Sequence, residues 1–328
     1  MPSQRPLTVE PLVAALPDSP PAADGAAAVP ADPRAAMSRI KADTLVGFVL
    51  CHGIALLALL PWFFSWTGVA LFAAGVFAFG MLGINIGFHR LLAHRGFGCP
   101  RWLERVLALL GTASMQFSPA FWVALHRRHH QFSDRPEDPH SPRHGFAWAH
   151  FGWLIRRRPF ELTPPVMTER YAKDLMRDPL FRFLERKNCW AIVALAVWGA
   201  FFAAGCLIAY AGGSGPGEAL QYGASLLVWG GALRTVYVWH TTWAVNSLTH
   251  VWGYRTHDTS DDSRNNPLVG ILAWGEGWHN NHHHDPVSPR HGQRWWEIDL
   301  SWAVIWTMMK LGLASPRRSA ARAGDTAE

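Results

Sequence analysis

Four long runs of apolar residues most constrain how this chain can fold. A helix needs about 20 residues to cross a hydrocarbon layer of about 30 Å, and each run is of that length. Apolar residues make up 49% of the 328-residue chain and charged residues only 16%, so the runs suit lipid better than the core of a soluble domain. The expected spans, arranged as two hairpins, are residues 44–64, 68–88, 189–210 and 219–245.

The distribution of lysine and arginine orients these spans. Residues 60–67 and 211–217, which join the helices of each hairpin, contain neither, whereas residues 90–187 and the tail after Ser315 are rich in arginine. Because positive loops stay in the cytoplasm, we expect both termini and the long middle segment on that side. The net charge of +6 then reflects attraction to an anionic leaflet and predicts no nucleic-acid partner.

Three parts of the chain follow from this composition. We expect a disordered cytoplasmic segment over residues 1–43, which is rich in proline and alanine and lacks the pattern of a signal peptide. Residues 44–314 form the membrane domain, and residues 315–328 a basic disordered tail. Neither tail is expected to carry the chemistry.

Nine histidines lie in four groups at the cytoplasmic ends of the spans or beyond them. They are His89 and His94; His126, His129 and His130; His250; and His279, His282 and His283. Neutral imidazole is the commonest side-chain ligand of iron, zinc and copper. The i, i+3, i+4 spacing in the second and fourth groups predicts helices that each offer three nitrogens to one site. His89 and His94 are about 140° apart on an ideal helix, so we expect the chain to leave the helix between them.

The number of histidines indicates which metal they bind. Tetrahedral zinc takes four ligands, whereas two iron ions with four or five nitrogens each would use all nine. His284 extends the last group and is an alternative to His283. Nearby carboxylates could orient the rings through their second nitrogen. The candidates are Glu276, Asp134, Asp138 and Asp262.

The other histidines are expected to be structural. His240 lies within the fourth span, where a hydrogen bond between helices is the simplest role. The rest of this set is His52, His140, His144, His150, His257 and His291.

The motifs HRLLAHR, HRRHH, NSLTH and GEGWHNNHH together resemble the signature of the integral-membrane fatty acyl desaturases of the stearoyl type, from about Thr44 to Leu313. The stretches DPHSPRHGF and THVWGYRTHDTSDDSRNN resemble bacterial and cyanobacterial members. The resemblance implies an all-α fold of four transmembrane helices under a cytoplasmic helical cap, in a bacterial inner membrane. It implies that the nine histidines bind two irons, that Asn246 holds a water beside one of them, and that a cis double bond, expected at Δ9, enters a saturated acyl chain.

The resemblance also bears on the substrate. Three residues that shape a bent substrate tunnel in the animal enzymes have counterparts in Gln116, Trp122 and Thr242. The animal enzymes place an arginine and an aspartate that hold coenzyme A just before the second histidine group, where this chain has Ala124 and Leu125. The acyl carrier therefore remains open among coenzyme A, acyl carrier protein and phospholipid.

The reaction requires dioxygen and two electrons from outside. The sequence has no flavin or nicotinamide fingerprint, no cysteine pairs for an iron–sulfur cluster and no cytochrome b5 motif. A ferredoxin, rubredoxin or cytochrome with its reductase is expected to dock on Arg127, Arg128 and residues 156–158. Two alternatives remain: a membrane hydroxylase or ketolase with the same ligands, and a metal transporter without catalysis.

Overall fold

The computed structural model describes residues 39–158 and 161–316, and these are mostly helical. The longer helices are α2 (Ala42–Leu56), α3 (Trp66–Gly75), η3 (Val76–Ala93), α4 (Arg101–Thr112), α5 (Pro119–Phe132), α9 (Cys189–Ala211), α10 (Pro216–Leu226), α11 (Arg234–Ser247) and α14 (Leu300–Lys310). The shorter ones are η1 (Leu57–Leu59), η2 (Pro61–Phe63), η4 (Pro142–His144), η5 (Trp148–Gly152), α6 (Trp153–Ile155), α7 (Pro164–Tyr171), η6 (Leu175–Arg177), α8 (Pro179–Glu185), η7 (Arg186–Asn188), η8 (Leu227–Leu233), η9 (Leu248–His250), α12 (Pro267–Leu272) and α13 (His279–His284). The strands β1 (Phe97–Gly98) and β2 (Ser315–Pro316) pair antiparallel, so the expectation of a helical protein is confirmed.

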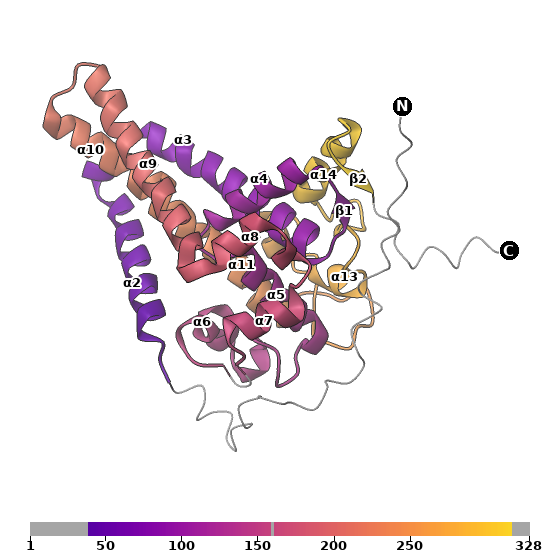
Figure 1. The fold of residues 1–328 in the computed structure, drawn as a ribbon. Coiled ribbons are helices and arrows are strands. Elements are labelled where there is room, and N and C mark those ends of the chain that lie inside the picture. The colour runs from indigo at the N-terminus through magenta and orange to yellow at the C-terminus, as the bar shows by residue number, and fades with distance from the viewer. Residues whose placement is uncertain (1–38, 159–160, 317–328) are drawn as a thin grey trace.

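Three helical runs are long and apolar enough to cross a membrane: Ala42–Leu59, Trp66–Ala93 and Pro179–Ala211. Large apolar side chains on them face outward; Leu59 is 79% exposed and Leu207 69%. Such exposure suits lipid contact and would be unfavourable in water. Figure 1 shows α3, α9 and α10 extending to one side of the molecule, away from α7 and α13, with α2 along that side and its first residues next to α6.

The first two spans end at different residues from those expected. The first helix stops at Leu59 rather than near residue 64, because Pro61 disfavours a helical conformation at Leu60, which is extended. The second helix does not stop at residue 88 but continues past His89 to Ala93, one residue before His94. This extension keeps His89 within the helix.

The fourth expected span lies within a continuous helical run formed by α10, η8 and α11, residues 216–247. Among the described residues this run is not one of the three that meet the criteria for a spanning helix. Arg234 interrupts its apolar sequence, but the side chain is buried and donates from Nη1 to the Ala113 carbonyl oxygen at 2.7 Å. Burial of the charge inside the protein keeps it away from lipid.

Small residues allow the helices to approach closely. A Cβ atom on Gly205 of α9 would lie 2.7 Å from the Cα of Gly223 in α10, and one on Gly83 of η3 would lie 2.7 Å from the Cα of Gly111 in α4. Glycine pairs at crossing points are typical of helices packed in a membrane. Most of the two tails, residues 1–38 and 317–328, lies outside the described residues.

Candidate metal centre

Nine histidines from η3 and its C-terminal cap, α5, η9 and α13 converge and divide into two neighbouring groups that could each hold a metal ion. The five-histidine group contains His89, His94, His126, His130 and His282. The four-histidine group contains His129, His250, His279 and His283. In each group the ligand atoms lie within 4.8 Å of one another. These are the nine histidines singled out in the sequence.

The first group is assembled by the unusual helix η3. Its wide, π-type turns are closed by hydrogen bonds between residues five apart, and one of these joins the His94 N–H to the His89 carbonyl oxygen at 3.1 Å. Residues five apart therefore lie on nearly the same side, and the ring centres of His89 and His94 are 4.9 Å apart. The helix ends at Ala93 and His94 is its C-terminal cap, so the chain leaves the helix between the two histidines as expected, while the wide last turn keeps the two rings together.

Helices α5 and α13 each divide their three rings between the two groups. In α5, His126 and His130 join the five-histidine group while His129 joins the other. In α13 the assignment is reversed: His279 and His283 face the four-histidine group and His282 the five-histidine group. The expectation that each helix supplies one site is therefore wrong, and both helices contribute to both groups.

The Nε2 atoms within each group point at one another. In the five-histidine group His94 and His126 are 2.7 Å apart, and His282 and His130 are 3.0 Å apart, measured between Nε2 atoms. In the four-histidine group His279 Nε2 lies 3.1 Å from His250 Nε2. This spacing is close to that of neighbouring ligands placed about 2.1 Å from one central metal ion.

Carboxylates hold the Nδ1 atoms of four rings, so the tautomers of these rings can be assigned. Asp138 lies 3.0 Å from His129 Nδ1, Asp134 2.9 Å from His250, Asp261 2.5 Å from His283 and Glu276 2.6 Å from His89. An ionised carboxylate only accepts, so each Nδ1 carries the hydrogen and each Nε2 of a neutral ring presents a lone pair. The His250 and His283 lone pairs both face His279 Nε2, at 3.1 and 3.0 Å, and one N–H of His279 could satisfy only one of them, whereas a cation between the three nitrogens would satisfy all. The donor set therefore fits a metal pair.

The charge state of these groups agrees with that assignment. Burial alone would raise the pKa of Asp138, but the nearby His129 and His140 rings lower it below its usual value. Burial and neighbouring rings lower the pKa of His126 and His279 well below 6.5. His129 is the exception: burial alone would lower its pKa, but the charge and hydrogen bond of Asp138, together with the charges of Asp134 and Asp261, raise it. Most rings are thus neutral at pH 7 and available as ligands.

Three of the four expected carboxylate partners contact a histidine ring, and one does not. Glu276, Asp134 and Asp138 do so, but the Asp262 carboxylate turns to the surface and pairs with Arg143 at 2.9 Å. Its neighbour Asp261 binds His283 instead. Two adjacent aspartates signalled a partner here, but the sequence alone could not say which of them points inward.

The alternatives among the remaining histidines are resolved by position. His284 is exposed and stacks on His257 with ring centres 3.9 Å apart, away from both groups. His240 forms the expected contacts between helices, with its ring nitrogens 3.0 Å from His52 Nε2 and from His150 Nε2. His291 was expected to be only structural, yet it is buried with its ring centre 4.5 Å from that of His282.

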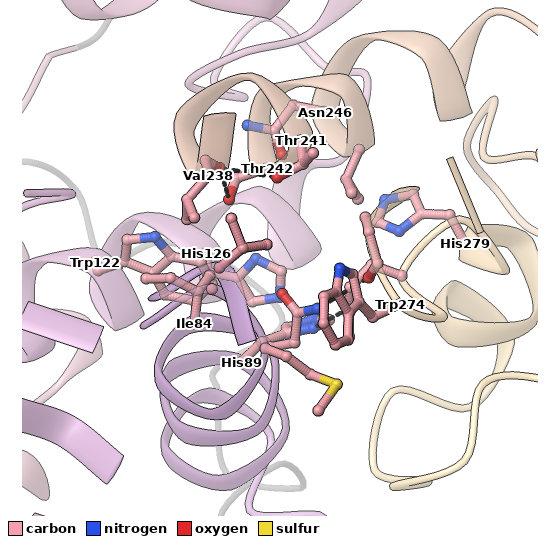
Figure 2. A pocket seen from close by; sticks show the side chains of 17 residues that line it. Ile84, His89, Trp122, His126, Val238, Thr241, Thr242, Asn246, Trp274 and His279 are labelled. Carbon is pink, nitrogen blue, oxygen red and sulfur yellow. Dashed lines mark hydrogen bonds and ion pairs between the residues drawn. The ribbon is translucent and has the colours of Figure 1, made fainter. Parts of the chain in front are cut away.

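A pocket adjoins both histidine groups (Figure 2). Helix η3 supplies Ile84 and His89, α5 supplies Trp122 and His126, and α11 and the loop after α12 complete the wall. The other labelled residues are Val238, Thr241, Thr242, Asn246, Trp274 and His279. Asn246 thus lies at the pocket together with His279 of the four-histidine group.

The three residues assigned to the tunnel bend form one hydrogen-bonded chain. Trp122 donates from Nε1 to Gln116 Oε1 at 3.3 Å, and Gln116 donates from Nε2 to Thr242 Oγ1 at 3.0 Å. The Trp122 ring stacks on His126, with centres 5.2 Å apart and planes 17° apart. The chain therefore links the pocket wall to the five-histidine group.

The arginines proposed as a docking surface are mostly not accessible. Arg127 binds Asp174 and the Leu92 and Ala93 carbonyl oxygens, and Arg128 and Arg158 are buried. Only residues 156 and 157 of that set are exposed. The basic residues of HRRHH thus stabilise the protein around the histidines.

The molecule thus combines three helices long and apolar enough to span a membrane with two histidine groups that could each hold a metal ion. Residues 61–316 match the sequence model of the family "Fatty acid desaturase". The chain belongs to the fatty acid desaturase family and is an oxidoreductase of that class.

The chain is similar to curated desaturases of cyanobacteria. It is 43% identical over 268 residues to the sn-1 stearoyl-lipid 9-desaturase of Anabaena variabilis, covering 82% of this chain and 90% of the relative. It is 42% identical to the sn-1 stearoyl-lipid 9-desaturase of Synechocystis sp., covering 81% and 77%. It is 40% identical to the sn-2 palmitoyl-lipid 9-desaturase of Nostoc sp., covering 82% and 87%. These names favour desaturation over the hydroxylase and transporter alternatives.

Proposed function

We propose that this protein introduces a cis Δ9 double bond into a saturated acyl chain esterified to a membrane lipid, at a two-iron centre held by the nine histidines. The observation that carries the proposal is the pair of converging histidine groups beside a pocket whose wall includes η3, part of a helical run apolar enough to span a membrane. Two similar proteins are named for stearoyl-lipid substrates and a third for a palmitoyl-lipid substrate, each with the bond at position 9.

Iron fits the donor set better than other metals. Nine imidazole nitrogens are divided five and four, which leaves coordination positions open for water or dioxygen on an ion that prefers six ligands. Two bound irons would supply the oxidant, made from dioxygen and two electrons, that removes hydrogen from an unactivated methylene. Asn246 lines the same pocket as His279, where it could hold a water as a further ligand of the four-histidine position.

The protein's own residues would position the acyl chain. Val76, Gly80, Met81 and Ile84 of η3 offer an apolar wall that leads from the membrane side toward His89. The hydrogen-bonded chain of Gln116, Trp122 and Thr242 would hold a bend in the acyl chain beside the metal centre. A fixed bend presents one pair of methylenes to the irons and excludes water from the reaction.

A membrane lipid suits this chain better than an acyl-CoA. The positions that carry an arginine and an aspartate in the animal acyl-CoA enzymes hold Ala124 and Leu125, which are 0% and 4% exposed. These side chains therefore offer no charge to a nucleotide carrier. Bilayer lipid could reach the pocket from the spanning helices without a soluble carrier.

We propose four spans in two hairpins, with residues 216–247 as the last, and the histidines on the cytoplasmic side of a bacterial inner membrane. An external ferredoxin, rubredoxin or cytochrome with its reductase would deliver electrons to that face. Of the arginines expected to form the docking surface, those at positions 156 and 157 are exposed, and they are candidates for the contact with the electron donor.

Expression in a bacterium that lacks desaturases tests the function directly. Lipids separated by class, and their fatty acids analysed by mass spectrometry, should contain monounsaturated acyl chains with the bond at Δ9. A product heavier by one oxygen would identify a hydroxylase instead, and unsaturation confined to the thioester pool would contradict the lipid substrate. A His126→Ala variant controls for background activity of the host.

A further inference from the structure

The two histidine groups differ in the carboxylates that support them. In the four-histidine group three of the four rings donate from Nδ1 to an aspartate: His129 to Asp138, His250 to Asp134 and His283 to Asp261. In the five-histidine group, within the described residues, the ring with a carboxylate partner is His89, which binds Glu276.

The net charge beside the two groups differs as well. Arg90 donates from Nε and Nη2 to Glu276 Oε1 at 3.0 and 2.9 Å, which offsets the charge of that carboxylate. The aspartates of the four-histidine group are held by neutral donors. Asp138 accepts from the backbone N–H groups of Asp134 and His140, and Asp261 accepts from the hydroxyls of Thr259 and Ser263. Within residues 39–158 and 161–316, their ion pairs are with histidine rings.

We infer that the two metal positions are unequal and that the four-histidine position binds a divalent cation first. Asp261 is a positioning residue for that cation. This inference rests on the proposed function. A carboxylate on Nδ1 makes the imidazole more basic and holds its orientation, and each such partner is typically worth about 10–100-fold in metal affinity. The uncancelled negative charges attract the dication further. Together these effects outweigh the one additional neutral imidazole of the five-histidine position.

The two neighbouring aspartates provide a matched pair of variants. Asp261→Asn keeps an acceptor oxygen for His283 but removes the charge, whereas Asp262→Asn removes a surface charge that pairs with Arg143. The full-length protein, purified in detergent and stripped of metal without oxygen, is titrated with iron(II) against a coloured chelator. We expect two binding steps in the wild type, a first step weakened by about 10–100-fold in Asp261→Asn, and no change in Asp262→Asn.

Removal of one ligand from each group identifies which position fills first. At one equivalent of iron(II), His283→Ala should fail to retain the ion at the wild-type affinity, whereas His94→Ala should retain it. Two equal steps in the wild type, an equal effect of both aspartate variants, or loss of the first ion in His94→Ala would overturn the inference and leave a two-metal centre intact. Failure of the folded wild type to bind two irons would overturn the metal centre of the proposed function itself. Circular dichroism and gel filtration establish that each variant is folded, and Asp261→Asn decides the question if His283→Ala is not.

Discussion

Removal of the Trp122 ring is the most informative perturbation of the pocket. The ring stacks on His126 at 5.2 Å, contacts Phe88 at 5.6 Å and donates to Gln116 at 3.3 Å. Each aromatic pair is worth about 0.5–1.5 kcal/mol and the hydrogen bond about 1 kcal/mol. Trp122→Ala should therefore cost about 3 kcal/mol of stability, the lower end of the range for large-to-small changes because the residue is only partly buried.

The effect on catalysis should be separate from the effect on folding. Without the ring, Gln116 loses one of its two partners and the bend loosens, so the reacting methylenes are held less well. A displacement of about 1 Å can lower the rate by about 100-fold. We expect Trp122→Ala to be slower and to give a mixture of double-bond positions, while Trp122→Phe, which keeps the stacking, should give mostly the wild-type isomer.

Double-bond positions in the product, initial rate, iron content and thermal stability should be measured on the same preparations. Normal iron content together with mixed isomers would support a role in shaping the substrate. If Trp122→Ala is as stable as the wild type and yields the same isomer at the same rate, the assignment of Trp122 to the tunnel bend is refuted.

Two further changes test other parts of the structure. His129→Ala should abolish turnover while leaving a folded protein, because it removes one metal ligand and no helix contact in the membrane; measurable residual turnover would make the ring structural. Burial alone would raise the pKa of Asp174, but its hydrogen bond and charge interaction with Arg127 lower it to about 2. A depressed folded pKa gives stability that is present above about pH 4 and lost as the pH falls toward 2, so Asp174→Asn should lower stability at pH 7 by about 2 kcal/mol. The stabilities of the wild type and Asp174→Asn, measured by thermal unfolding, should converge between pH 4 and pH 2. A difference in stability that stays constant over this range would contradict the lowered pKa of Asp174.

The sequence by itself determined which residues could take part in the site. Ionisable side chains at the ends of long apolar runs cost free energy, so a cluster of them in such places indicates a function. The nine histidines could therefore be identified from their positions alone. The three apolar helical runs followed from length and hydropathy, because lipid requires both. Gln116, Trp122 and Thr242, which make one hydrogen-bonded chain in the structure, came from their positions relative to recognised motifs.

Only the tertiary structure decided how the histidines are divided. Spacing along α5 and α13 puts three rings on one face, but which ring meets which group depends on how these helices cross η3 and the segment at His250. The wide turns of η3 that align His89 and His94 are likewise invisible to an ideal helical period. Partners far apart in sequence set the outer contacts, such as Glu276 for His89 and Asp261 rather than Asp262 for His283. Local residue patterns report which side chains can bind a metal, whereas the grouping of those side chains depends on contacts that exist only once the helices have packed.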